Sequence, residues 1–351
     1  MPQTIWNMLF SVQQNYTPGS GSFWMPPPGS AGAHEVDWLV RVLLYVCTFF
    51  FLLITSLLVT FVIRYRRSRV AGPQPSASHS LPLELAWSII PLAILMMFFY
   101  FGFRGFINSM TPPDDAYSIQ VTGQKWAWLF TYPNGYVDKD LHVPVDTAVK
   151  LTLTSEDVIH SLFIPAFRLK RDALPGRYTT TWFQADRTGT FDLFCTEYCG
   201  EGHSAMLAKV IVHDKVEYKK WLEDAGAFID RMPPAQAGAR LFQTQGCAQC
   251  HSVDGSGGIG PSLKNVYSTQ QPMKGGGSVL ADEDYLRESI MDPQAIIVAG
   301  FEPVMPTYKG RLKDKEITVL IAYIKSISKA GQNELEFDAG AGKDRKEDAA
   351  K

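Results

Sequence analysis

Two long apolar runs near the start of the chain dominate its hydrophobic pattern. Val42–Ile63 is a run of 22 uncharged, mostly apolar residues, and Leu85–Phe103 is a second uncharged run of 19. At about 1.5 Å per residue, a helix of either length crosses a hydrocarbon core of about 30 Å. One such run could be the buried helix of a soluble protein, but two in series favour membrane spans. The pattern therefore predicts a two-helix transmembrane hairpin over residues 36–110.

The charges around the two runs predict their orientation. The connection between them contains the basic segment Arg64–Arg69, whereas acidic residues flank the outer end of each run. Cytoplasmic loops are enriched in Lys and Arg, so we expect the connection in the cytoplasm and both termini on the other side. Residues 1–35 are rich in Pro and Gly and predict an irregular extracytoplasmic segment. Its short apolar stretch, Ile5–Val12, is no clear secretory signal.

After the second span the pattern changes to short β-rich runs separated by Pro, Gly and Asp. Six runs carry this signal: Tyr117–Val121, Trp126–Tyr132, Val149–Thr154, Tyr178–Phe183, Gly189–Phe194 and Leu207–Val212. Several short strands with frequent turn signals are typical of an all-β sandwich, which we expect over residues 116–213. Trp126 and Trp128 stand at alternate positions and are expected on one face of their strand.

The last third of the chain has a helical pattern. Residues 214–234 predict a linker, with a short helix and a break at Pro233–Pro234. Residues 235–330 predict an all-α domain that includes the amphipathic run Glu316–Lys325. Residues 331–351 are charged and rich in Gly and Ala, and we expect them to be disordered.

Charge and cysteine usage narrow the function. The net charge of −2 over 351 residues indicates no nucleic-acid partner. Four of the five cysteines form two close pairs, which are typical of cofactor motifs and not of a disulfide framework. The chain has only seven histidines, too few to bind an oxygen-reducing haem and its copper in addition to these motifs.

The first cysteine pair belongs to a compact set of soft metal ligands. Cys195, Cys199, His203 and Met206 lie in one loop-sized segment, and His160 is available from upstream. Thiolate, thioether and imidazole ligands together favour copper, zinc or iron–sulfur over hard cations. A structural zinc site would not need the methionine, and a disulfide would leave both histidines unexplained.

The number of thiols indicates two metal ions. A mononuclear blue-copper site uses one Cys, whereas two thiolates can bridge two coppers and leave each copper one terminal His. Met206 would then be a weak ligand of one copper, and a backbone carbonyl, that of Glu197, would serve the other. Such a pair shares one electron with little change of geometry, which suits electron transfer.

The second cysteine pair predicts a covalent c-type haem. Cys247-Ala-Gln-Cys250-His251 matches the C-x-x-C-H attachment motif, in which the adjacent His binds the iron. A thioredoxin-like C-x-x-C site lacks that His and needs a βαβ pattern that is missing here. Three downstream methionines compete as the second axial ligand: Met273, Met291 and Met305.

These motifs resemble known families. From Val36 to His213 the chain resembles subunit II of haem–copper cytochrome c oxidases, and the C-terminal part is similar to class I cytochromes c. The first resemblance rests on His160, on the copper-loop motif and on flanking segments: Gly123–Trp128, Tyr132-Pro133, Val143–Val145, Ser155–Pro165 and Asp172–Arg177. The second rests on the haem motif and Gly258–Leu263, and it favours Met305, which precedes a Pro ahead of the last helix.

The resemblance implies an architecture and a function. It implies a multidomain membrane protein with a cupredoxin-like copper domain and a fused cytochrome c domain, as in haem-c-containing aa-type oxidases. It implies a bacterial plasma membrane with the soluble domains in the periplasm. Electrons would pass from cytochrome c or an upstream respiratory complex to haem c, to the copper pair and to haem a in subunit I. Further oxidase subunits and membrane lipid would be its other partners.

The resemblance also implies roles for single residues. Trp126 would be the surface-exposed electron entry point next to copper, although core packing is the ordinary role of an indole. Glu197 would bind a magnesium ion at the border with subunit I, where Asp172 and Arg177 also lie. Glu84 would mark a proton-channel entrance, although a carboxylate at a helix N-terminus is also favoured by the macrodipole alone.

Other function classes remain to be distinguished. A standalone membrane-anchored copper and haem carrier would purify without a large haem-containing partner. Nitrous oxide reductase needs an additional His-rich copper cluster that seven histidines cannot supply. Quinol oxidases lack the copper ligands that are present here.

Overall fold

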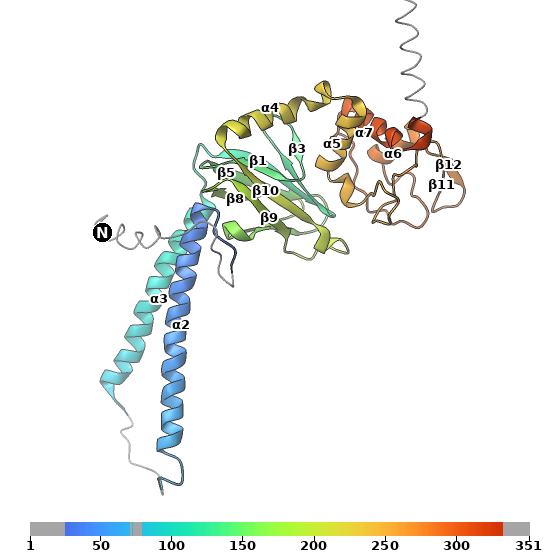
Figure 1. Ribbon diagram of the computed structural model, residues 1–351. Helices are drawn as coiled ribbons and strands as arrows, with labels where there is room; N and C mark the ends of the chain where they lie inside the picture. The colour runs from blue at the N-terminus through green and yellow to red at the C-terminus, as the bar shows by residue number, and fades with distance from the viewer. Residues whose placement is uncertain (1–24, 71, 73–78, 333–351) are drawn as a thin grey trace, which may run out of the picture.

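The computed structural model describes residues 25–70, 72 and 79–332 of the chain, which form a helical hairpin, a β-sandwich and a helical domain (Figure 1). This order is the predicted fold class. The predictions made for Ile5–Val12 and for most of the C-terminal tail lie outside the described residues.

The hairpin consists of α2 (Ala31–Arg64) and α3 (Leu81–Met110). Their most apolar 18-residue windows have mean hydropathies of 2.6 and 2.0, and none of either window is buried within the chain. By length and composition both can therefore cross a membrane. The prediction that residues 1–35 are irregular is wrong for the last five, because the Ser30 hydroxyl accepts a hydrogen bond from the Ala33 amide and begins α2 at Ala31.

Polar contacts join both spans to the sandwich. The Arg168 guanidinium binds the Asp37 carboxylate of α2 through two contacts of 2.8 and 2.9 Å. The Trp182 indole N–H donates to the Asn108 carbonyl of α3 at 2.7 Å. Paired Arg–carboxylate contacts fix direction as well as distance. The sandwich is thus held in a defined position beside the ends of α2 and α3 that lie away from the connection between them.

Two five-stranded sheets form the sandwich, in the orders β3-β2-β1-β5-β8 and β4-β10-β9-β6-β7. The strands are β1 (Tyr117–Gln124), β2 (Ala127–Thr131), β3 (Val137–Asp138), β4 (Leu141–Pro144), β5 (Ala148–Ser155), β6 (His160–Ile164), β7 (Leu169–Ala173), β8 (Thr179–Gln184), β9 (Gly189–Cys195) and β10 (Leu207–His213). Strands β1 and β5 pair in parallel, as do β4 and β10, and most other neighbours are antiparallel. Four of these strands, β3, β4, β6 and β7, were absent from the sequence prediction.

The sandwich core follows strand alternation. Ile119, Val121, Leu151 and Leu153 are fully buried on the central strands β1 and β5. Trp128 is fully buried as well, whereas Trp126 lies in the turn between β1 and β2. The prediction that both indoles lie on one strand face is therefore wrong, because β2 begins only at Ala127.

The predicted linker is a helix packed on the sandwich. Helix α4 (Lys215–Arg231) is capped by Asp214, whose carboxylate accepts from the Val216 amide at 2.9 Å. Trp221 stacks on the His142 ring with centroids 4.0 Å apart, and Phe228 is buried. Pro233 is then the N-cap of the next helix, which begins at Pro234, so that only two residues separate the two helices.

The C-terminal domain is built on α5 (Pro234–Thr244), α6 (Glu283–Met291) and α7 (Asp314–Ser326), with one short hairpin of β11 (Gln270–Pro272) and β12 (Ser278–Leu280). Helices α5 and α7 cross closely at Gly238, where a Cβ atom would overlap the Val319 carbonyl. The domain lies at the end of the sandwich, beyond α4 (Figure 1).

Candidate copper and haem sites

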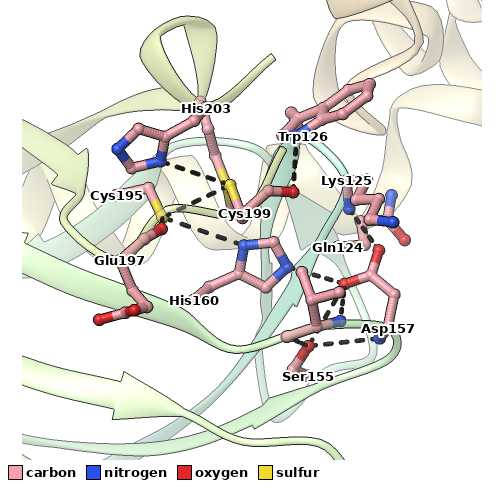
Figure 2. Close-up of polar contacts among 12 residues, drawn as sticks. Gln124, Lys125, Trp126, Ser155, Asp157, His160, Cys195, Glu197, Cys199 and His203 are labelled. Atoms are coloured by element: carbon pink, nitrogen blue, oxygen red, sulfur yellow. Dashed lines mark hydrogen bonds and ion pairs between the residues drawn. The ribbon is translucent and has the colours of Figure 1, made fainter. Parts of the chain in front are cut away.

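Neighbouring strands of one sheet bring the first cluster together. His160 begins β6 and Cys195 ends β9, and these strands pair antiparallel with Leu162 opposite Cys195. Cys199, His203 and Met206 lie in the loop that joins β9 to β10. The sheet supplies His160 and Cys195, and the loop brings Cys199 and His203 beside them (Figure 2).

The ligating atoms of this cluster converge. The Cys195 and Cys199 sulfurs are 3.9 Å apart, and each has an imidazole Nδ1 beside it, His160 at 3.9 Å and His203 at 3.5 Å. The Met206 sulfur lies 3.8 Å from Cys199. On the other side the Glu197 carbonyl lies 3.3 Å from the Cys195 sulfur.

This donor set fits a soft metal. The ligating atoms of His160, Cys195 and Cys199 all lie within 4.8 Å of one another, and both thiols are free and buried. Paired thiolates with imidazoles and a thioether match the preferences of copper. The cluster also contains two thiols and two imidazoles, enough donors for two copper ions that would share the thiolates.

Burial and hydrogen bonds make the two thiols unequal. Burial opposes ionisation of Cys195, but its hydrogen bonds to His160 and to the backbone dominate and lower its pKa to about 7. Burial raises the pKa of Cys199 to about 12, and the negative charge of Cys195 adds to that rise. One thiolate is therefore favoured before a metal binds.

A residue without a predicted role orients His160. The His160 Nε2 atom lies 2.8 Å from the Asp157 carboxylate, which also accepts from the Lys125 backbone amide at 2.7 Å. Burial would lower the pKa of His160, but the hydrogen bonds to Asp157 and Cys195 and the negative charges of both groups together raise that pKa. Such a partner fixes the ring so that Nδ1 faces the Cys195 sulfur, where it would be available to a metal. Its spacing, three residues before a candidate ligand, was the available sequence signal.

Trp126 lies against the copper loop, which is the segment that joins β9 to β10 (residues 196–206). Its indole N–H donates to the Cys199 carbonyl at 3.1 Å, and a Cβ on Gly202 would lie 2.5 Å from the ring. The side chain is only 6% exposed. The expectation of a surface-exposed tryptophan is therefore wrong, because the C-terminal domain covers this face of the sandwich.

The second cluster lines an apolar cavity in the C-terminal domain. Cys247, Cys250, His251 and Met305 share this lining, and residues 124–127 of the sandwich close it from outside the domain. The His251 Nδ1 atom lies 2.9 Å from the Pro261 carbonyl, which leaves Nε2 for a ligand. An apolar cavity with two thiols, an imidazole and a thioether fits a haem held by the C-x-x-C-H motif.

The methionines differ in position. Met305 is the methionine among the residues that line the cavity. The Met273 side chain instead packs near Gly277, where a Cβ would lie 3.4 Å from its terminal methyl, and Met291 ends α6.

The remaining predicted residues lie apart from both clusters. The Glu84 carboxylate accepts from the Ser80 amide at 3.1 Å, the contact expected of a helix N-terminal carboxylate. Asp172 accepts from the Ser161 hydroxyl at 2.6 Å, and this hydrogen bond lowers its pKa. The Glu197 side chain and Arg177 are exposed to solvent.

Together the hairpin, the soft-ligand sandwich and the helical domain define a membrane-anchored electron-transfer protein of the copper and haem class. Three family models match the chain: the transmembrane domain of cytochrome c oxidase subunit II over residues 18–104, its periplasmic domain over 134–214, and cytochrome c over 235–328. The chain belongs to the cytochrome c oxidase subunit II family and has a cytochrome c domain fused at its C-terminal side. It is thus a subunit of a haem–copper oxidase.

Relatives are similar over most of their length. Cytochrome c oxidase subunit 2 of Alkalihalophilus pseudofirmus is 30% identical over 75% of this chain and 79% of the relative. That of Thermostichus vulcanus is 30% identical over 63% and 85%, respectively. That of Cereibacter sphaeroides is 30% identical over 59% and 82%. The families of the two soluble domains imply copper in the sandwich and haem in the helical domain.

Proposed function

We propose that the chain is the electron-entry subunit of a bacterial respiratory oxidase, in which a covalent haem c receives electrons and a dinuclear copper centre passes them to haem a of subunit I. The domain boundaries would be residues 36–110 for the membrane anchor, 116–213 for the copper domain, 214–234 for the connection and 235–330 for the haem domain. The soluble domains would face the periplasm, and cytochrome c or an upstream respiratory complex would be the donor.

The chain's own residues would divide the work. Cys195 and Cys199 would bridge the metals, His160 and His203 would be terminal ligands, and Met206 and the Glu197 carbonyl would be weak ligands. In the other domain Cys247 and Cys250 would hold the haem, with His251 and Met305 as axial ligands. The Glu197 carboxylate would also bind magnesium at subunit I, and Glu84 would stand at a proton-channel entrance.

The observation that carries the proposed electron path is the position of Trp126. It lines the cavity of the helical domain together with Cys250, and its indole N–H donates to the Cys199 carbonyl at 3.1 Å. One residue therefore lines the proposed haem cavity of one domain and hydrogen-bonds a proposed copper ligand of the other. The rate of electron transfer falls steeply with distance, so a shared residue with contacts on both sides favours direct transfer between the sites.

Removal of the haem domain tests this path. Truncation after Asp230 keeps α4, which packs on the sandwich, and deletes α5 and everything after it. The truncated subunit should still assemble with its oxidase and bind two coppers. Turnover with the native donor should be lost, while a small reductant that reaches the copper directly should still drive oxygen consumption.

The outcomes separate the alternatives. Full turnover of the truncated enzyme with its native donor would remove the haem domain from the main path. Purification of the full-length chain in mild detergent without a large haem-containing partner would favour a standalone carrier.

A further inference from the structure

Arg311 connects the haem domain to the part of the copper domain that holds Trp126 and His160. It lies between Met305 and α7, and its guanidinium forms a 2.7 Å ion pair with Glu156. The same guanidinium donates to the Gln124 side-chain oxygen at 3.0 Å. One side chain of the haem domain therefore binds two residues of the sandwich, through two different nitrogens.

Both partners are fixed close to the proposed electron path. Gln124 ends β1, two residues before Trp126, and is 2% exposed. Glu156 precedes Asp157, the carboxylate that binds both the Lys125 amide and the His160 ring. A shift of Arg311 would therefore be felt at the turn that carries Trp126 and at the loop that carries a copper ligand.

Arg311 is also anchored on its own side. Its guanidinium carbon lies 5.6 Å from the centre of the Tyr308 ring, and Tyr308 is buried in the lining of the haem cavity. The Tyr308 hydroxyl donates to the Gln245 carbonyl at 3.4 Å, just ahead of the C-x-x-C-H segment. A cation over an aromatic face is attracted to it, which orients the guanidinium towards the sandwich.

We infer that Arg311 is a positioning residue that holds the haem cavity against Trp126 in the orientation required for electron transfer. This inference rests on the proposed function. It adds to it a specific contact that sets the distance between the two sites. Because the Arg311 side chain is 25% exposed and that of Glu156 is 40% exposed, salt should weaken but not abolish the contact.

The test measures transfer from haem to copper in the purified oxidase by stopped-flow absorbance. Arg311→Gln and Glu156→Gln should each slow this step several-fold, because the rate of electron transfer falls steeply as the two sites move apart. The haem and copper spectra should not change, nor should reduction of the copper by a small direct reductant.

Arg287→Gln is the matched control, because Arg287 pairs with Asp314 inside the haem domain.

A charge reversal separates positioning from general stability. The double variant Arg311→Glu with Glu156→Arg should recover much of the lost rate, since the ion pair is restored and the Gln124 amide can turn to donate. In the chain alone, amide exchange of residues 124–127 should become faster in Arg311→Gln and return toward the original rate in the double variant. This second measurement does not require electron flow.

The inference is overturned if both single variants transfer electrons at the original rate, or if the reversed pair is as slow as the single variants. Both results differ from a failure of the proposed function. If the proposed function is wrong, the truncated enzyme will keep its turnover with the native donor, whatever residue stands at position 311.

Discussion

At the scale of single residues, Trp126 is enclosed by groups from both soluble domains. It contacts Gly202 and the Cys199 carbonyl of the copper domain, and it lines the cavity of the haem domain together with Cys250. Its hydrogen bond to Cys199 ties the indole to a loop that also bears two candidate ligands. The indole is therefore positioned by both domains.

Trp126→Phe should slow transfer from haem to copper at least tenfold while leaving the copper spectrum unchanged. The phenyl ring keeps most of the packing but loses the N–H bond to Cys199 and part of the contact area. Stopped-flow absorbance can follow both centres in one reaction. Trp182→Phe is the control, because it removes an indole bond to α3 and should leave the transfer rate unaltered.

Met305→Ala should lower the reduction potential of the haem and abolish the absorption band of the methionine–iron bond. A thioether ligand raises the potential of a His-ligated haem, so its loss has a definite sign. Redox titration of the intact oxidase measures the shift. Met273→Ala should leave potential and band unchanged, and the opposite result would reassign the ligand.

The sequence predicted single residues of the two sites better than their surroundings. The copper and haem motifs are short and specific, so their members could be named without a fold. Asp157 and the Pro261 carbonyl were not found, because an Asp three residues before a His does not by itself predict a contact and a backbone carbonyl leaves no signal in the sequence. The exposure of Trp126 was predicted wrongly, because burial by another domain leaves no trace in the local pattern.

At the scale of elements, α4 depends on a cluster of buried titratable groups. His142 and His213 lie with ring nitrogens 2.8 Å apart, and Trp221 of α4 stacks on His142. Burial, together with the neighbouring His213, lowers the pKa of His142 to about 3. Burial also lowers the pKa of His213, whereas it raises the pKa of Asp138 to about 6.

Acidification should therefore destabilise the contact between α4 and the sandwich. The stability that a neutral His142 provides is complete above its unfolded pKa of about 6.5 and is lost below it, by up to about 1.4 kcal/mol per pH unit. Asp138 acts in the opposite sense, since its protonation below pH 6 favours the fold, but two histidines outweigh one carboxyl. The thermal midpoint should fall between pH 7 and pH 5.

His142→Gln should flatten this pH dependence, measured as the thermal midpoint of the purified chain. The exposed His79 is the matched control, and His79→Gln should leave the slope as it was. An unchanged slope in His142→Gln would show that the cluster does not govern the acid response.

The sequence predicted the spans and the sandwich class but missed four strands. Strands β3 and β4 are two and four residues long, and β6 and β7 contain polar residues, so none gives a strong periodic signal. The helix in residues 214–234 was expected to be short and part of a linker. Its packing depends on partners from β4 and β10, which no local pattern contains.

At the scale of the whole molecule, three parts are joined by packed contacts. Arg168 and Trp182 bind the spans to the sandwich, α4 covers the sandwich edge, and Arg311 ties the haem domain to it. The described chain thus offers no loose connection between the anchor and the haem domain. The fused domain also occupies the face of the sandwich where Trp126 would otherwise meet solvent.

The position of the haem domain on the sandwich changes the kinetic order expected for reduction of the copper. A carrier that must diffuse to the copper domain gives a bimolecular step, whose rate grows with concentration and falls with viscosity. A haem domain seated on Trp126 has no encounter to make, so reduction of the copper should be a first-order process. Its rate constant should stay the same when the oxidase is diluted or when glycerol is added. A rate constant that falls with viscosity would mean that the domain searches for its contact at every turnover.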